Sequence, residues 1–190
     1  GFAVAWGIFM IIFLLGAGNG LINAQLDQQS RHLANSIKIF GGQTSKPFKG
    51  LEKGRFITLK ESDVEITDKT FSDNTSNVGS EISVNGINIS LGDNYISAQS
   101  LNGVYPSDKD INRREMITGR FINDIDMKDR RKVIALWQTQ AKELDKNPER
   151  LIGKHVKVGE LAFMVVGIVK DDKQGQNNTA FIPYTTLKTV

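Results

Sequence analysis

The sequence predicts an α+β protein in which an N-terminal transmembrane helix continues as a stalk into a mixed α/β domain. Residues 2–22 are apolar and uncharged, as is typical of a membrane-spanning helix. Apolar residues alternate as in β-strands around residues 82–91 and 156–158, form a continuous run at residues 161–166, and take helical spacing over residues 137–144. With 190 residues, 39% of them hydrophobic, the chain is long enough for one domain with its own core or for two small lobes.

The charge and cysteine content exclude several classes of function. Lys and Arg are mixed with Asp and Glu along most of the chain, and the net charge is only +3, so no nucleic-acid partner is expected. The basic excess between Lys38 and Lys60 lacks the interleaved aromatic residues of an RNA-binding sheet and indicates solvated surface. The absence of cysteine excludes disulfide frameworks, zinc ribbons and thiol chemistry.

The N-terminal segment is the most apolar part of the sequence. Residues 2–22 are FAVAWGIFMIIFLLGAGNGLI, and the first charged side chain is that of Asp27. At a rise of 1.5 Å per residue, such a helix spans about 30 Å, the thickness of the hydrocarbon core of a bilayer. A surface helix of a soluble protein would show a polar face, and this segment shows none.

Three membrane interpretations compete for this segment. A cleaved signal peptide would need a basic residue before Phe2 and a small-x-small cleavage site after the apolar run, and neither is present. Type IV pilins resemble this start in beginning Gly-Phe, but they carry Glu where this chain has Trp6. We therefore favour a permanent transmembrane anchor, residues 1–22. No initiator Met or flanking charge precedes it, so we expect the chain to begin inside a longer protein, and its orientation does not follow from charge.

Two sets of residues are candidates for helix packing. Gly16 and Gly20 form a small-xxx-small pair, which lets two helices approach closely in lipid, although glycine is common in membrane helices in any case. A stalk helix is predicted over residues 23–36. Its apolar stripe packs either on a partner helix or on the chain's own domain. The stripe consists of Ile22, Leu26, Leu33 and Ile37.

The stretch after the stalk predicts short strands, a helix and a hairpin. Residues 37–39 and 57–59 alternate like strands, with a glycine- and proline-containing loop between them. The capping-box pattern Ser62-Asp-Val-Glu65 starts a short helix. Alternating apolar residues flank Asn85-Gly86, which is the strongest short-range hairpin signal, and residues 95–104 form a further strand.

The last third predicts a buried strand, a helix and a second hairpin. Residues 133–136, Val-Ile-Ala-Leu, form a short apolar run suited to a buried strand. The helix that follows stops at Asn147-Pro148, because proline interrupts helical hydrogen bonding. Residues 156–158 and 161–166 flank Gly159-Glu160 as a hairpin, and the second of these strands is apolar on both faces, which predicts a central position.

The sequence indicates no catalytic, cofactor or metal site. The Walker A pattern GxxxxGK[ST] is absent, so no ATP site of that kind is expected. Asp124, Asp126 and Asp129 match a calcium loop only in part, because an EF-hand needs Gly at the sixth position, where Asp129 stands. We expect these three carboxylates to be solvated loop charge.

The remaining chemistry-bearing residues also suggest surface positions. Asp171-Asp172 precedes a polar loop and is expected to be solvated. His32 and His155 are the only histidines, and neither has the companions that a catalytic or metal pair would need. We expect no enzyme activity and no cofactor on this chain.

Taken in order, these segments resemble the periplasmic core domain of MacB-type ABC transporter permeases. The resemblance is carried by MITGRFINDIDMKDRRKVIALWQTQAKEL, LIGKHVKVGELAFMVVGIVKDD and AFIPYTTL, together with GGQTSKPFKGL and the apolar N-terminus. It covers essentially all 190 residues. The Gly119-Arg120-Phe121 triplet and the acidic residue after it come in the family's order. One departure is Trp137-Gln138, where the family usually has a Gly soon after the Val-Ile strand, and this could alter the strand-to-helix turn.

The resemblance implies a domain organisation. Residues 37–71 and 133–190 would form a porter-like lobe, and residues 72–132 an inserted β-rich lobe. Family members have four transmembrane helices with this domain between the first two, so the chain would stop partway through the domain and be truncated at both ends.

The resemblance also implies a function. The protein would be the permease subunit of an ABC transporter in the bacterial inner membrane, with its main domain in the periplasm. That domain would couple cytoplasmic ATP hydrolysis to export or other envelope work by mechanotransmission. The implied partners are an ABC ATPase, a second copy or a paired permease, a periplasmic adaptor protein and membrane lipid.

The sequence is also compatible with two other functions. The extracytoplasmic ligand-sensing domain of a receptor would also show one helix followed by an α/β domain, with a concave pocket of convergent polar groups. A pilin-like structural subunit would require cleavage before Phe2 and assembly into filaments.

Overall fold

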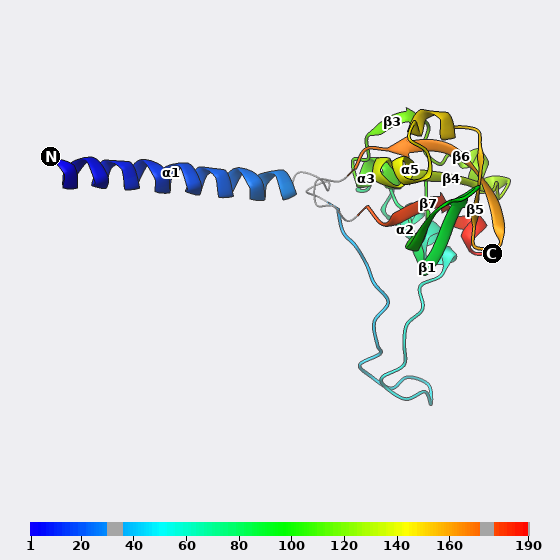
Figure 1. The fold of residues 1–190 in the computed structure, drawn as a ribbon. Helices are drawn as coiled ribbons and strands as arrows, with labels where there is room; N and C mark the ends of the chain where they lie inside the picture. The colour runs from blue at the N-terminus through cyan, green and yellow to red at the C-terminus, as the bar shows by residue number, and fades with distance from the viewer. Residues whose placement is uncertain (30–35, 172–176, 190) are drawn as a thin grey trace. The chain divides into compact units, whose positions relative to one another are not determined.

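The structure is a computed structural model that describes residues 1–29, 36–171 and 177–189 (Figure 1). The chain divides into two compact units, Gly1–Lys38 with Ile111–Arg113 and Ile39–Asp110 with Arg114–Val190, and each unit is described by itself. The helices are α1 (Phe2–Gln29), α2 (Glu61–Phe71), α3 (Asp108–Ile111), α4 (Asp124–Lys128), α5 (Gln138–Leu144), the 3₁₀ turn η1 (Pro148–Leu151) and α6 (Tyr184–Leu187). The strands are β1 (Glu81–Leu91), β2 (Asn94–Val104), β3 (Met116–Gly119), β4 (Val133–Trp137), β5 (His155–Val158), β6 (Leu161–Val169) and β7 (Thr179–Pro183).

The first unit is built on α1, which has the length and composition of a membrane-spanning helix. Its segment Phe2–Ile22 has 21 residues and a mean hydropathy of 2.0, and none of that segment is buried. Among the described residues it is the one helix long and apolar enough to cross a membrane. The helix continues beyond this segment to Gln29, into the predicted stalk. The prediction for residues 30–35 lies outside the described residues, and Ser36 is not helical.

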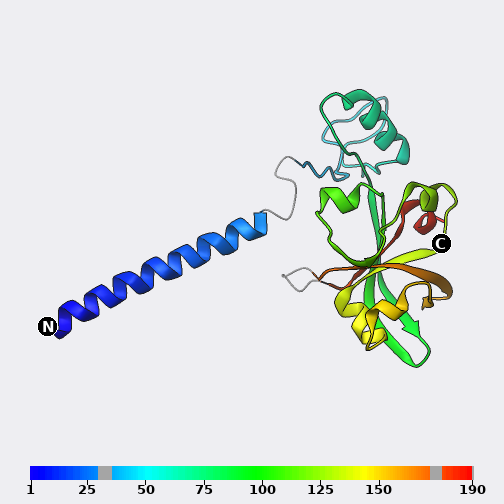
Figure 2. The same cartoon turned by 90° about the horizontal axis from the view of Figure 1, so that it is seen from above.

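The second unit is organised around a closed β-barrel. Within the described residues, seven strands form one sheet in the order β3-β6-β4-β7-β2-β1-β5. Strand β6 also pairs with β5, so the six strands from β6 to β5 close into a ring. Figure 2 shows the same strands after a turn of 90° from the view of Figure 1. The pairings β2–β7 and β4–β6 are parallel, and the others in the ring are antiparallel.

The barrel strands bury apolar side chains on both faces. One core cluster includes Ile89, Ile134, Phe163, Ile168 and Ile182. A second cluster, on the other face of β4, β6 and β7, includes Phe121, Val133, Trp137, Val166 and Phe181. All five residues of β4 are buried, which explains why its sequence is a continuous apolar run rather than an alternation. Each large apolar side chain removed from water contributes about 1.5–3 kcal/mol to stability.

The predicted turn of the first hairpin was wrong. Strand β1 runs straight through Asn85-Gly86, and the chain reverses at Gly92-Asp93, where Leu91 pairs with Asn94. Gly86 takes a positive φ of 77°, and the strand register shifts on both sides of Ile87, so Asn85-Gly86 forms a β-bulge. Continuing the strand brings Ile89 into the core, where it is 1% exposed. That burial favours the bulge over an early turn.

Residues 36–60 form no strand, contrary to the prediction for residues 37–39 and 57–59. Two isolated bridges, Gln43–Phe56 and Phe48–Leu51, are their only β-pairings in the described chain. A strand needs a neighbour for its backbone groups, and no strand of the described sheet pairs with this stretch. Its apolar side chains are consequently exposed, Phe40 by 80% and Phe56 by 83%.

Helix α2 begins one residue before the predicted cap at Ser62. The backbone N–H of Lys60 donates to Asp63 Oδ2 at 2.7 Å, so Asp63 closes the first turn. The second hairpin, β5–β6, forms as predicted around Gly159-Glu160, and Val158 pairs with Leu161. Strand β4 and helix α5 also occur where the sequence places them, and Pro148 begins the 3₁₀ turn that follows.

Strands pair across residue 132, where the predicted lobes 72–132 and 133–190 meet. Strand β2 pairs with β7 over five residues, from Ser100–Thr179 to Val104–Pro183. Strand β1 pairs with β5, and β3 with β6. Residues on both sides of the expected boundary therefore share one sheet and one core, because β2 supplies the hydrogen-bonding edge that β7 needs. The lobe boundaries and the assignment to porter-like and inserted lobes stay predictions.

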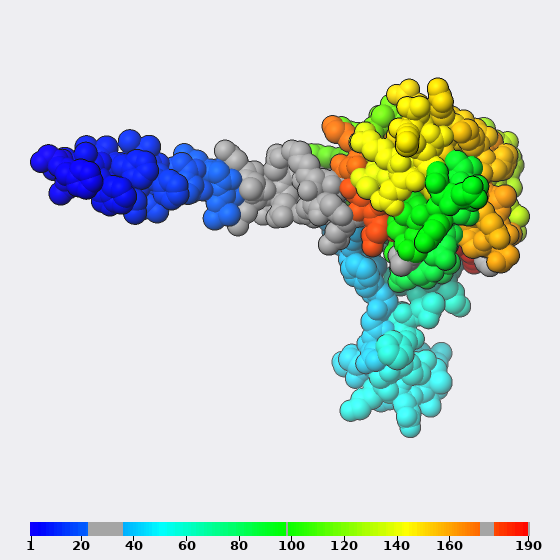
Figure 3. Space-filling model, in the orientation of Figure 1, coloured from blue at the N-terminus to red at the C-terminus, as the bar shows by residue number. Residues whose placement is uncertain are grey.

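Helix α5 covers one side of the barrel. In Figure 3 its residues lie beside the tip of the β1–β2 hairpin. Asn94 Nδ2 donates to the carbonyl oxygen of Leu144 at 2.9 Å, which ties the end of α5 to the start of β2. Asp171 accepts hydrogen bonds from the backbone N–H and the hydroxyl of Thr139, so it caps the start of α5 and is not merely solvated. Asp172 lies outside the described residues.

Candidate functional site

Helix α1 presents one face with a regular pattern. Trp6, Phe9, Phe13, Gly16 and Gly20 recur every three or four residues, so they share a side of the helix. The rings of Trp6 and Phe9 are 5.7 Å apart, and those of Phe9 and Phe13 are 6.4 Å apart. A Cβ atom added at Gly16 or Gly20 would meet nothing within 4 Å. This face is therefore bulky in one half and flat in the other, and packing of another helix at Gly16 and Gly20 stays a prediction.

The stalk stripe is described only in part. Ile22 is 55% exposed and Ile37 is 86% exposed, and Ile37 lies outside any helix. Leu33 and His32 lie outside the described residues, as does the side chain of Leu26. The packing partner of the stripe therefore stays a prediction.

The Gly119-Arg120-Phe121 triplet forms a tight crossing over β6. Gly119 pairs with Gly167 and has a φ of +74°. A Cβ atom at Gly119 would overlap the carbonyl oxygen of Val166, and one at Gly167 would overlap the carbonyl oxygen of Arg120. The backbone N–H of Arg120 donates to Val166 O at 2.9 Å. The close approach requires glycine on both strands.

Arg120 then reaches a buried carboxylate. Its Nη1 and Nη2 donate to the two oxygens of Asp126, the second at 3.0 Å, and Nη1 also donates to the carbonyl oxygen of Phe121. The Asp126 side chain is fully buried, whereas that of Arg120 is 41% exposed. Asp126 also accepts from the backbone N–H of Asn123 at 3.1 Å, and Asn123 Oδ1 accepts from the N–H of Asp126 at 2.9 Å. This reciprocal capping box starts α4.

The expectation that Asp126 is solvated loop charge was therefore wrong. Its spacing from Asn123 is that of a capping box, a signal that the sequence contains. Asp124 and Asp129 are exposed, as expected, and Asp129 pairs with Arg131. His155 is exposed on β5, also as expected. Across the described ranges, no group of three or more His, Cys, Asp or Glu side chains is placed to hold a metal ion.

The strand-to-helix turn at Trp137-Gln138 is closed by glutamine side chains. The backbone N–H of Trp137 donates to Gln140 Oε1 at 3.0 Å, and Gln140 Nε2 donates to Gln99 Oε1 at 2.6 Å. The Trp137 ring packs edge-on against Phe181 at 5.4 Å. The guanidinium of Arg114 lies over the Phe181 ring at 4.1 Å. Trp137 thus takes a packing role in the second core cluster.

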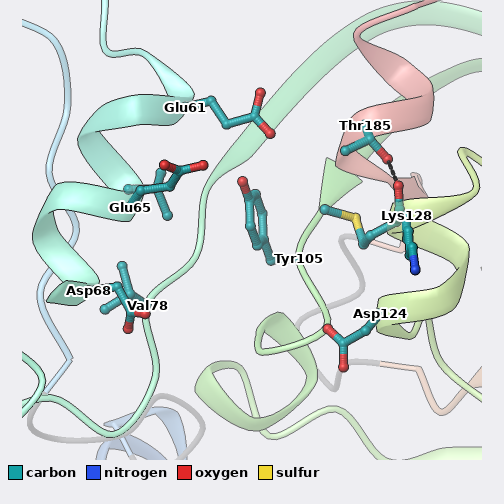
Figure 4. Close-up of a pocket in the computed structure, with 10 residues that line it drawn as sticks. Glu61, Glu65, Asp68, Val78, Tyr105, Asp124, Lys128 and Thr185 are labelled. Carbon is teal, nitrogen blue, oxygen red and sulfur yellow. Dashed lines mark hydrogen bonds between the residues drawn. The ribbon is translucent and has the colours of Figure 1, made fainter.

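An open depression of about 480 Å³ lies between α2 and the barrel (Figure 4). Glu61 and Glu65 extend from α2 towards Tyr105, and Asp124 and Lys128 line the other side. Its remaining lining residues are Val64, Asp68, Val78, Met127 and Thr185. No local sequence pattern predicts this feature, because its residues come from five separate stretches of the chain.

Tyr105, which lines the depression, has a raised pKa. Burial raises its pKa from 10.0 to about 12, and the carboxylate of Glu61, then Tyr184 and Glu65, add to the increase. The Tyr105 ring also packs on that of Tyr184 at 5.1 Å. A raised pKa means that the folded state disfavours the phenolate. Between pH 10 and about 12 the unfolded chain loses this proton first, so stability should fall as pH rises through that window.

We expect an alkaline titration to show this phenol directly. The ultraviolet absorbance of tyrosinate should include a component that titrates near pH 12, and Tyr105→Phe should remove it. Tyr95→Phe is the control, since the Tyr95 side chain is 71% exposed on the hairpin. Loss of the late component in the control but not in Tyr105→Phe would contradict the assignment.

Comparisons with known proteins agree with this fold. A family model described as the MacB-like periplasmic core domain matches residues 2–190. The solved periplasmic region of MacB from Actinobacillus actinomycetemcomitans is similar, with a TM-score of 0.58 and 25% identity, over 68% of this chain and 57% of that one. The extracellular domain of the noncanonic ABC-type transporter YknZ from Gram-positive bacteria matches with a TM-score of 0.58 and 19% identity. That match covers 69% of this chain and 65% of the YknZ chain, and it shows the fold alone.

The chain spans less than two thirds of either solved relative, 57% of one and 65% of the other. No curated protein sequence matches it. The family match extends over the apolar helix as well as the barrel unit.

Proposed function

The chain belongs to the family of MacB-like periplasmic core domains, and we propose that it serves in an ABC transporter permease as the part that converts cytoplasmic ATP hydrolysis into movement outside the membrane. ATP would be bound by a separate ABC ATPase. The barrel unit would lie in the periplasm, anchored by α1 in the inner membrane. A second copy or a paired permease, a periplasmic adaptor and membrane lipid are the further partners that we propose.

The observation that carries this proposal is the continuity of α1. The helix has 28 residues and continues past the apolar span without interruption. At 1.5 Å per residue it is about 42 Å long, which exceeds the roughly 30 Å of a hydrocarbon core. A helix that projects beyond the membrane as one piece can pass a shift of its cytoplasmic end to the chain that follows it.

The proposal predicts ATP-dependent movement of the barrel unit. The 190 residues contain no cysteine, so Asp93→Cys adds a single labelling position to them, in the turn of the β1–β2 hairpin; any cysteine elsewhere in the assembly is replaced beforehand. In the assembled transporter in lipid, the label-to-label distance between two copies should change when ATP is added. The control is an assembly whose ATPase lacks its Walker A lysine, which should show no change. Identical distance distributions with and without ATP in the active assembly would refute the coupling.

A further inference from the structure

Helix α2 rests on the barrel without becoming part of its core. None of its residues is buried, and Ile66 and Phe71 are 60% and 51% exposed. The open depression separates α2 from Tyr105 and from the loop carrying Asp124 (Figure 4). Interdigitated side chains, which make the separation of packed elements costly, are missing from this contact.

Polar contacts link α2 and the chain that follows it to the barrel. In the part of the chain that the structure describes, two side-chain hydrogen bonds join residues 61–80 to the barrel unit after them. Lys188 Nζ donates to Glu61 Oε2 at 2.8 Å, and Ser107 Oγ donates to the carbonyl oxygen of Val78 at 3.1 Å. Both partners in the ion pair are partly exposed, Lys188 by 55% and Glu61 by 36%. Exposed ion pairs are weak, so this one is suited to reversible opening.

The charges around the depression make the contact between α2 and the barrel depend on Lys188. Helix α2 contributes three carboxylates, those of Glu61, Glu65 and Asp68. The barrel side contributes Asp124, which repels them, and Lys128. Lys188 pairs directly with Glu61, and this contact raises the pKa of Lys188. Without Lys188, α2 would lose its direct pairing with a cation of the barrel side, and Asp124 and Lys128 would largely offset each other there.

We propose that α2 is a hinged flap that Lys188 holds against the barrel and that opens about residues 72–77. These residues, Ser-Asp-Asn-Thr-Ser-Asn, are rich in turn formers and belong to no helix or strand. On the other side of α2, residues 36–60 also lack regular secondary structure. The flap therefore has irregular chain on both sides.

The functional meaning of the flap rests on the proposed function. In chain order α2 stands between α1 and the barrel, so an opened flap would let the barrel change its orientation without distortion of its strands. Docking of the flap on the barrel is distinct from the proposed ATP-dependent movement, because it is measurable without nucleotide.

The test measures docking with two labels on the full protein in lipid. Lys69→Cys on α2 and Asp93→Cys on the barrel are both exposed and outside the ion pair. Without nucleotide, the distance distribution should show a docked and an open population. Lys188→Glu should lower the ratio of docked to open molecules by about threefold or more, because it replaces an attraction with a repulsion.

A charge swap distinguishes the ion pair from a general effect of charge. The double substitution Glu61→Lys with Lys188→Glu should restore the docked population. Lys146→Glu, the same change at an exposed barrel lysine outside the depression, should leave the distribution unaltered. An unchanged ratio in Lys188→Glu, or a swap that fails to restore docking, would overturn the flap. A flap that opens normally in a protein with no ATP response would refute the coupling alone.

Discussion

Gly119→Ala should destabilise the barrel unit by about 3 kcal/mol or more. Two costs combine at this position. A φ of +74° strains any residue with a Cβ atom, which alone costs about 1 kcal/mol. The new Cβ would also overlap Val166 O and approach the Cα of Gly167 at 2.9 Å, so the β3–β6 crossing would have to separate. Both contacts are with backbone atoms, which have no rotamer to change.

Gly153→Ala is the matched control. Gly153 has a similar φ of +82°, but a Cβ atom there would meet nothing within 4 Å. It should therefore show the cost of the backbone conformation alone, about 1 kcal/mol. Urea unfolding in detergent, followed by the fluorescence of Trp137 in a Trp6→Phe background, measures both. Equal losses in the two variants would contradict a steric role for the crossing.

Asp126→Ala should cost about 2–3 kcal/mol of unfolding free energy. The fully buried carboxylate is held by the Arg120 guanidinium and by the Asn123 N–H, and alanine removes both contacts. Breaking a fully buried ion pair costs about 3–5 kcal/mol. The expected loss is smaller because the Arg120 side chain is 41% exposed and water can hydrate it.

The neighbouring carboxylate provides the comparison for this variant. Asp124→Ala removes an exposed charge from the same short helix and should change stability by no more than about 0.5 kcal/mol. The same fluorescence-monitored unfolding applies. If Asp126→Ala were as mild as Asp124→Ala, the buried pair would not be a main stabilising contact of this segment.

The elements that the sequence predicted well are those whose signal is local. Strand β4 is a short continuous apolar run, and the β5–β6 hairpin has two apolar runs joined at Gly159-Glu160; both form. The apolar segment of α1 has no polar face and is a continuous helix. The Asn85-Gly86 hairpin failed because a local turn signal competed with burial of Ile89, which lies farther along the chain. Tertiary burial outweighed the local preference of Asn-Gly for a hairpin turn.

The residues of the candidate site were less predictable, because sequence spacing does not reveal tertiary neighbours. Asn123 and Asp126 are three residues apart, so their capping box was detectable. The contact of Glu61 with Lys188 joins positions 127 residues apart and has no local signal. The β2–β7 pairing, which joins strands on the two sides of residue 132, is likewise a long-range contact without a local signal.

The pairing of β1, β2 and β7 also brings the two ends of the barrel together. Glu81, where β1 starts, pairs with Val104, and Val104 pairs with Pro183, where β7 stops. Glu81 and Pro183 are therefore two interstrand spacings apart, which is about 10 Å. If the barrel were inserted into another polypeptide, the two points of that polypeptide that flank the insertion would therefore stay close together. The barrel is therefore of a form that a surface loop of another fold could acquire whole, with little disturbance to the host.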